Sequence, residues 1–154
     1  MYQHILVPTD GSEGTAEVVA HAIEIARDRD ATVHVLSVAD RRVYLSADED
    51  RQEEVLEQLR AQAQEAVDSA AAEIEDASDD AGVDVDVVTE VREGIPHTEI
   101  LRYGDDADVD IVVIGTHGRT GKEKLVHLGS VTDRVVKEAG QPVLVVRIGP
   151  GEAD

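Results

Sequence analysis

Glycine, hydroxyl and basic residues concentrate between Gly115 and Ser130, directly after a short apolar run at 111–114. The charged residues of this segment are three basic side chains and one acid: Arg119, Lys122, Lys124 and Glu123. The segment is therefore locally positive in a chain whose formal net charge is −20. Backbone amides and the dipole at a helix N terminus favour an anion, and glycine allows close approach. We expect a phosphate or carboxylate site here; the alternative is a basic loop that pairs with the acidic surface.

Two common phosphate fingerprints do not fit this segment. A Walker A loop has four residues between its first glycine and Gly-Lys, followed by Ser or Thr. Here Gly115 and Gly121-Lys122 enclose five residues, and Glu123 follows. The dinucleotide fingerprint GxGxxG is also missing, because two residues separate Gly115 from Gly118. A P-loop ATPase and an NAD or FAD enzyme are therefore not expected.

Nucleophilic and metal chemistry receive little support from the sequence. Ser12 or Ser130 could join His117 and Asp10 as the residue types of a triad, but the GxSxG elbow is missing. The six histidines lack the spacing of three or four residues that zinc ligands on a helix need, so we expect no dedicated metal site. A divalent ion such as Mg²⁺ would arrive on the phosphates of a nucleotide.

The composition limits the partners and the location of the protein. With no Phe and no Trp, the core must be aliphatic and a stacking platform for nucleic acid is not expected. With no Cys, the chain has neither disulfides nor a thiolate site, which favours a cytoplasmic location. The apolar runs are too short for a signal peptide or a membrane span.

The charge balance is strongly acidic, with 34 Asp and Glu against 14 Lys and Arg. Such a surface repels nucleic acid and anionic lipid, so we expect neither as a partner. A dense shell of carboxylates also keeps a protein soluble in concentrated salt, which screens its self-repulsion. We hypothesise a halophilic protein; the alternative is an acidic protein of an ordinary cytoplasm.

Hydrophobic periodicity and turn residues predict five strands that alternate with four helices. The expected strands are 4–7, 32–38, 83–91, 110–115 and 143–147, and the expected helices are 12–28, 48–80, 95–103 and 130–138. This alternation predicts a single-domain α/β fold over residues 1–148, with a frayed tail at 149–154. The near-continuous Val and Ile runs predict an open, twisted, five-stranded parallel sheet with helices on both faces, a Rossmann-like arrangement.

The two longest expected helices have recognisable inner faces. For helix 12–28 we expect the buried residues to be Ala16, Val19, Ala20, Ile23 and Ala26. For helix 48–80 we expect Leu56, Leu59, Ala63, Ala66, Ala70, Ile74 and Ala77. The second helix also carries 13 acidic residues against two basic ones, which indicates a solvated outer face.

Ligands of parallel sheets bind at the carboxyl ends of the strands, near a switch point in the strand order. Two loops leave such ends with suitable chemistry, namely residues 8–12 and residues 115–130. Asp10 in the first loop is either a ribose ligand or a turn-forming residue.

The glycines Gly115, Gly118 and Gly129-Ser130 resemble the nucleotide motif of the universal stress protein family, Gly-2x-Gly-9x-Gly-Ser/Thr. The stretches GTHGRTG, GSVTDRVV and QPVLVVR are each typical of that family, as are the opening ILVPTDGSEGTAEVVAHAIEIA and the later VHVLSVAD. The resemblance spans the whole chain. The sequence departs from the pattern at one place, because ten residues, RTGKEKLVHL, separate Gly118 from Gly129 where the motif has nine.

The resemblance implies a fold like that of the adenine nucleotide alpha hydrolases and a stress-linked module that binds ATP or a related adenine nucleotide. The implied site residues are Pro8, Thr9, Asp10, Val38, Ile114, Gly115, His117, Gly118, Arg119, Gly129, Ser130 and Val131. Asp10 would contact the nucleoside, and the backbone of Val38 would meet adenine. The amides of residues 129–131 and the Ser130 hydroxyl would bind the phosphates. The resemblance also implies a homodimer formed through residues 143–147.

Two other functions stay open at this point. The same pocket could serve a slow ATP or phosphoanhydride hydrolase, for which Asp10 and His117 are the available bases. Alternatively, the ten-residue spacing leaves an interaction protein that binds no nucleotide.

Overall fold

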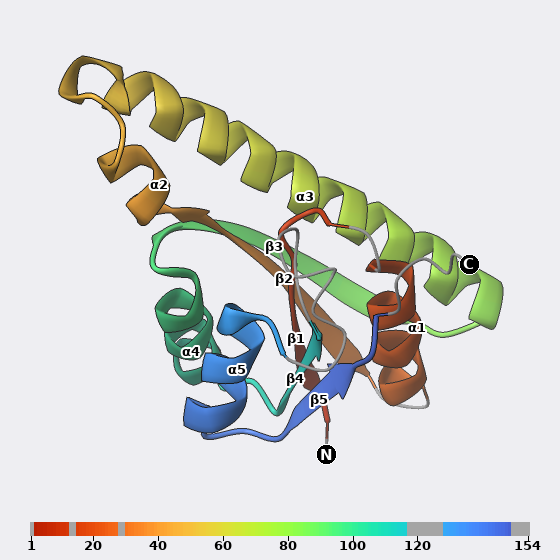
Figure 1. The fold of residues 1–154 in the computed structure, drawn as a ribbon. Helices are drawn as coiled ribbons and strands as arrows, with labels where there is room; N and C mark the ends of the chain where they lie inside the picture. Colours follow the sequence, from red (N-terminus) through yellow and green to blue (C-terminus); the bar gives the residue numbers. More distant parts are fainter. Residues whose placement is uncertain (1, 13–14, 28–29, 117–127, 149–154) are drawn as a thin grey trace.

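The computed structural model describes residues 2–12, 15–27, 30–116 and 128–148. Five strands form one sheet: β1 (His4–Pro8), β2 (Ala31–Asp40), β3 (Val85–Gly94), β4 (Ile111–Gly115) and β5 (Val143–Val146) (Figure 1). The α-helices are α1 (Thr15–Ala26), α2 (Arg41–Leu45), α3 (Gln52–Ala81), α4 (Pro96–Asp106) and α5 (Ser130–Glu138), and a 3₁₀ turn, η1 (Glu49–Arg51), precedes α3. The predicted tail at 149–154 lies outside the described residues.

Every strand pair in the sheet is parallel, and the strand order is β3-β2-β1-β4-β5. The central strand β1 lies between β2, where Pro8 is opposite Leu36, and β4, where Leu6 is opposite Val112. From β1 the chain proceeds to β2 on one side, whereas from β4 it proceeds to β5 on the other. The point between β1 and β4 is therefore the switch point of the sheet.

Alternation along the strands divides the core into two layers. Val33 and Val35 lie in the layer that α1 and α3 cover, together with Ile23 and Ile74. Leu6 and Leu36 lie in the opposite layer, which α4 and α5 cover (Figure 1). The predicted five-stranded parallel sheet with helices on both faces is thus confirmed, and among the described residues the fully buried hydrophobic side chains are aliphatic apart from Tyr103.

The inner face of α1 differs from the prediction. Ala16 and Ala20 are exposed, whereas Val18 and Ala22 are buried beside the correctly predicted Val19, Ile23 and Ala26. The helix packs against both the sheet and α3, and burying a valine removes more apolar surface from water than burying an alanine. The stripe that includes Val18 is therefore the one turned inward.

Helix α3 follows the predicted face in its middle turns and departs from it near both ends. Ala63, Ala66, Ala70 and Ile74 are buried as expected, together with Val67 and Ser78. Leu56 and Leu59 are only half-buried, because the first turns of α3 extend beyond the end of β2 (Figure 1). Ala77 is also half-buried. Among the described residues, no helix combines the length and apolar character needed to cross a bilayer.

Candidate nucleotide site at the carboxyl ends of β1 and β4

Helix α5 begins without a side-chain cap. Its N-cap residue is Gly129, with φ of −62° and ψ of 160°, so the N-cap position supplies no side chain to accept a hydrogen bond from the first turn. The first amides of a helix have no partner within the helix, so those of Ser130 and Val131 are available to an acceptor from outside. The acid in the first turn, Asp133, is paired with Lys137 at 3.1 Å. The positive end of α5 is therefore suited to an anion.

Two threonines hold this helix end against β4. Thr132 is 4% exposed, and its hydroxyl donates a hydrogen bond to the carbonyl oxygen of Gly115 at 2.7 Å. The amide of Gly129 donates to the carbonyl of Thr116 at 2.7 Å. The Thr116 hydroxyl accepts from the amide of Ile148 at 3.1 Å, which ties in the chain after β5. Sequence reasoning missed both threonines, although each lies within three residues of a predicted glycine.

Gly115 lies at a crowded position at the end of β4. A Cβ atom there would collide with Cδ1 of Ile148. The crowding comes from the end of a flexible side chain, so an alanine would require Ile148 to move rather than the backbone. The expectation that Gly115 lets the chain approach ribose stays a prediction.

The loop after β1 is shaped by short-range hydrogen bonds. The hydroxyl of Thr9 accepts from the amide of Gly11 at 3.1 Å, and Oδ1 of Asp10 accepts from the amide of Ser12 at 2.9 Å. Gly11 has a φ of 81°, a conformation that favours glycine. The Thr9 amide donates to the carbonyl of Leu36 at 2.9 Å, which fixes the loop to β2. Asp10 thus has the turn-forming role considered from the sequence, which leaves its contact with a ligand as a prediction.

The sheet register places most of the predicted site residues at one edge. Pro8 ends β1, and Ile114 and Gly115 end the neighbouring β4. Val38 lies in β2, two residues beyond the position opposite Pro8, and is half-buried against the α4 side of the core. The remaining members of the predicted set, His117, Gly118 and Arg119, lie outside the described residues.

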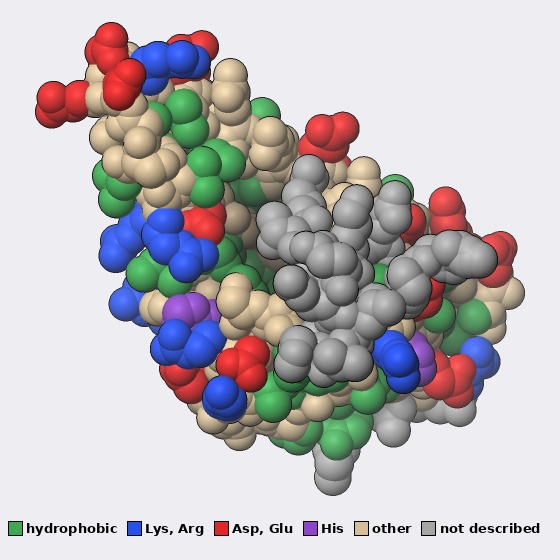
Figure 2. All heavy atoms as spheres, viewed as in Figure 1, with side chains coloured by type: hydrophobic (Ala, Val, Ile, Leu, Met, Phe, Trp, Pro, Cys, Tyr) green, Lys and Arg blue, Asp and Glu red, His purple; other side chains and the backbone are tan. Residues whose placement is uncertain are grey.

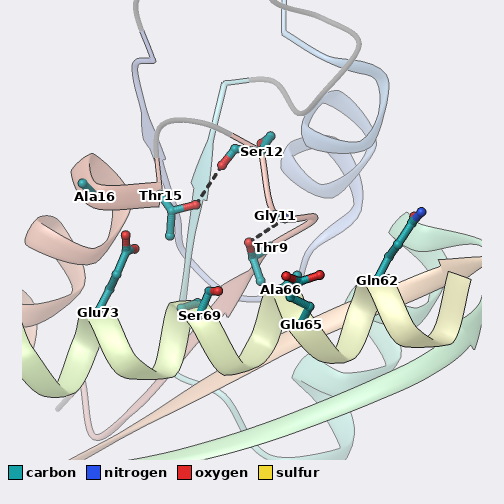
Figure 3. A pocket seen from close by; sticks show the side chains of 11 residues that line it. Thr9, Gly11, Ser12, Thr15, Ala16, Gln62, Glu65, Ala66, Ser69 and Glu73 are labelled. Carbon is teal, nitrogen blue, oxygen red and sulfur yellow. Dashed lines mark hydrogen bonds between the residues drawn. The ribbon is translucent and has the colours of Figure 1, made fainter. Parts of the chain in front are cut away.

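An open cavity of about 480 Å³ lies between α3, the loop after β1 and the start of α1 (Figure 3). It is lined by Thr9, Gly11, Ser12, Thr15, Ala16, Gln62, Glu65, Ala66, Ser69, Ala70 and Glu73. Thr9 is the one predicted site residue among them. The charged side chains of this lining are the carboxylates of Glu65 and Glu73, which would repel a phosphate. The lining of this cavity is therefore less suited to an anion than the start of α5.

A second helix, α2, begins at the same edge of the sheet, and a side chain of the protein caps its N terminus. Asp40 ends β2 and caps α2, because its Oδ1 accepts from the backbone amide of Arg42 at 3.0 Å. Its other oxygen accepts from the Arg42 guanidinium at 2.7 Å. Burial acts to raise the pKa of Asp40, but these hydrogen bonds and the arginine charge outweigh it, so the pKa is lowered. The dipole of α2 is thus already met by a carboxylate.

The sequence predicted no dedicated metal site. Within the described part of the chain, no group of three or more His, Asp or Glu side chains is placed to hold a metal ion.

Comparison with known proteins places this architecture in a family. The model of the universal stress protein family matches residues 1–147. Universal stress protein MJ0531 of Methanocaldococcus jannaschii is 36% identical over 148 residues, covering 96% of this chain and 83% of that protein. MJ0577 of the same organism is 34% identical, and its solved structure superposes with a TM-score of 0.81 over 96% of this chain and 97% of that one.

A further solved structure shows a related protein with a ligand. The universal stress protein from Archaeoglobus fulgidus in complex with dAMP superposes with a TM-score of 0.64 at 25% identity, covering 94% of this chain and 98% of that one. The match of the family model over nearly the whole chain, together with relatives more than 30% identical, is decisive. The chain belongs to the universal stress protein family.

Proposed function

We propose that this protein binds an adenine nucleotide, with ATP as the principal ligand, at the carboxyl ends of β1 and β4. The observation that carries the proposal is the uncapped N terminus of α5, held against β4 by the bond from Thr132 to Gly115. The dAMP complex of the related Archaeoglobus protein supports an adenine nucleotide as the anion.

Each part of the ligand has a proposed contact. The phosphates lie at the amides of residues 129–131 and the hydroxyl of Ser130, where the helix dipole favours negative charge. The nucleoside lies against the loop that holds Asp10 and against the backbone of Val38. Mg²⁺, where present, is bound through the phosphates, as this ion commonly keeps several waters and takes phosphate ligands.

The test is the ATP affinity of the wild-type protein and of Gly129→Val, measured by calorimetry in molar KCl. The φ of −62° at Gly129 is open to any residue, so valine should not disturb the backbone. It should nevertheless abolish binding by obstructing close approach of the phosphates. Gly140→Val is the matched control, because a Cβ at Gly140 meets nothing within 4 Å. Equal affinity in Gly129→Val and the wild type would contradict the proposed site.

Two other outcomes of that experiment identify other functions. ATP turnover that is lost in Asp10→Asn would indicate a hydrolase, because asparagine keeps the hydrogen bond to Ser12 but removes the charge. Absence of binding at every salt concentration would indicate an interaction protein without a nucleotide.

We also propose that the protein forms a homodimer through β5. This strand ends the sheet order, and the predicted segment 143–147 corresponds to Val143–Val146 with Arg147 just beyond it. An apolar edge strand has unpaired backbone groups that can join a second copy. Sedimentation at high salt should give twice the chain mass; a monomer at micromolar concentration would contradict the dimer.

We further propose that the protein acts in the stress response, in a cytoplasm of high salt. The acidic surface supports the high salt concentration. Acidic side chains spread over the α3 side of the molecule (Figure 2), and the formal net charge is −20. Salt screens the repulsion among them. The thermal unfolding midpoint should therefore rise from low to molar KCl, and a midpoint independent of salt would contradict the halophilic assignment.

A further inference from the structure

Two histidines and a tyrosine form a hydrogen-bonded chain beneath α4. Nδ1 of His4 on β1 lies 3.1 Å from Nε2 of His34 on β2. Nδ1 of His34 lies 2.7 Å from the hydroxyl of Tyr103 on α4. His34 is 7% exposed and Tyr103 is 5% exposed, so both lie within the second core layer, whereas His4 is half-buried. These contacts fasten α4 to the two central strands that carry the histidines.

The geometry limits how many protons this chain can hold. In the neutral chain, one of the two facing ring nitrogens donates and the other accepts. One added proton can be accommodated, because a charged ring can donate to the neutral nitrogen opposite it. Two added protons cannot, because His4 and His34 would then point N–H groups at each other across 3.1 Å. The closed structure therefore holds at most one extra proton, whereas two separated imidazoles hold two.

The surrounding charges act in opposite directions on this chain. The Asp110 carboxylate accepts a hydrogen bond from the backbone amide of His4 at 2.9 Å. From β3, Glu90 and Arg92 face the chain of rings, and the Arg92 guanidinium lies 5.0 Å from the centre of the Tyr103 ring. Arg92 is itself paired with Glu90 at 2.5 Å and with two acids of α4, Glu99 at 3.7 Å and Asp106 at 3.8 Å. The pKa of His34 is lowered by burial first and by the His4 charge second, with Glu90 opposing both.

We propose that His4, His34 and Tyr103 form an acid-sensitive latch that holds α4 on the sheet at neutral pH and releases it on acidification. The released or unfolded state binds one more proton than the closed state. Closure is therefore favoured above the ordinary histidine pKa, near 6.5, and is progressively lost as the pH falls below it. For one excluded proton the opening constant rises by up to about tenfold per pH unit.

The test is the unfolding equilibrium of the full chain between pH 7.5 and pH 5 in molar KCl, for the wild type and for His4→Gln. Glutamine offers His34 an acceptor without a second charge, so the extra proton is no longer excluded. We expect the unfolding constant of the wild type to rise more steeply with acidity, by up to about tenfold per pH unit over the variant. His21→Gln is the control, because His21 is exposed on α1, and it should match the wild type.

Ring titration by NMR in the wild-type protein decides the question even if the variant does not fold. The latch predicts that at most one of the two rings becomes charged while the α4 amides stay protected from hydrogen exchange. Two independent ring titrations near 6.5 with α4 still protected would overturn it. Equal pH slopes for the wild type and His4→Gln would overturn it as well.

Discussion

Helices α2 and α5 both begin at the carboxyl edge of the sheet, but their first turns are treated differently by the sequence. Asp40 caps α2 with its own carboxylate and binds Arg42 through both backbone and side chain. Gly129 begins α5 and supplies no side chain, while Thr132 uses its hydroxyl to fix the helix to β4 instead of capping it. The N terminus of α2 is therefore met by a carboxylate of the chain itself, whereas the N-cap residue of α5 supplies none.

A helix N terminus can bind an external anion only when no carboxylate of the protein itself already accepts hydrogen bonds from its first turn. Glycine at the N-cap stabilises a helix nearly as well as a capping side chain, so leaving the position open has a small cost. At α5 two hydrogen bonds offset this small cost in stability by fixing the start of the helix. The Gly129 amide donates to the carbonyl of Thr116, and the Thr132 hydroxyl donates to the carbonyl of Gly115.

The largest expected effect comes from giving α5 the cap that α2 already has. In Gly129→Asp a carboxylate would accept from the first-turn amides and occupy the phosphate position. ATP affinity should fall by at least about 100-fold, which corresponds to roughly 2.7 kcal/mol or more, while stability stays unchanged or rises slightly.

Gly140→Asp serves as the control for the added charge, because a Cβ at Gly140 meets nothing within 4 Å. Calorimetric titration of both variants at one salt concentration separates a lost site from general repulsion. Equal affinities in the two variants would mean that the start of α5 does not hold the phosphates.

A smaller effect is expected from removing the bond that positions α5. Thr132→Val keeps the size of the buried side chain but leaves the carbonyl of Gly115 without this partner. The free energy of unfolding should fall by about 1–3 kcal/mol, and ATP affinity should fall with it. Thr98→Val is a suitable control, since the Thr98 hydroxyl makes a long contact of 3.4 Å to the neighbouring His97 rather than a short hydrogen bond across the fold. Full ATP affinity in Thr132→Val would show that this bond does not shape the site.

The smallest effect is expected at α2. Asp40→Ala removes the cap and should lower the free energy of unfolding by about 1 kcal/mol at neutral pH, with no effect on ATP affinity. Because the pKa of Asp40 is lowered in the folded protein, its contribution is present above the ordinary value of 3.8 and is lost as the pH falls through the lowered pKa. Urea unfolding at pH 7 and pH 3 measures this; a loss of ATP affinity would contradict the contrast between the helices.

The sequence predicted the sheet because its signal is local. Runs such as Val33 to Val38 carry β-branched and apolar residues along their length, and a strand buried on both faces requires this pattern. The five-residue α2 was missed because it is too short for a hydrophobic period, although Asp40 at its N-cap is a helix-start signal. The choice of Val18 and Ala22 over Ala16 and Ala20 depends on how α1 meets α3, which no local pattern contains.

The candidate site was predictable to a similar degree. Glycine spacing predicted Gly115 and Gly129 as site residues, which stays a prediction, and the register brings the ends of β1 and β4 to one edge. The roles of Thr116 and Thr132 could not be predicted from the sequence, because their partners are Ile148 and Gly115. These contacts form only when β4, α5 and the segment just after β5 pack together. The acidic cavity beside α3 likewise arises from two segments far apart in the sequence, residues 9–16 and residues 62–73.

Amide chemical shifts followed by NMR during titration test the central claim most directly, with ATP and adenosine compared at the same molar KCl. The open start of α5 predicts that ATP, and not adenosine, shifts the amides of Gly129, Ser130 and Val131. Both ligands should shift the loop at Asp10. Shifts confined to the cavity residues between Glu65 and Glu73, with the α5 amides unchanged by ATP, would contradict it.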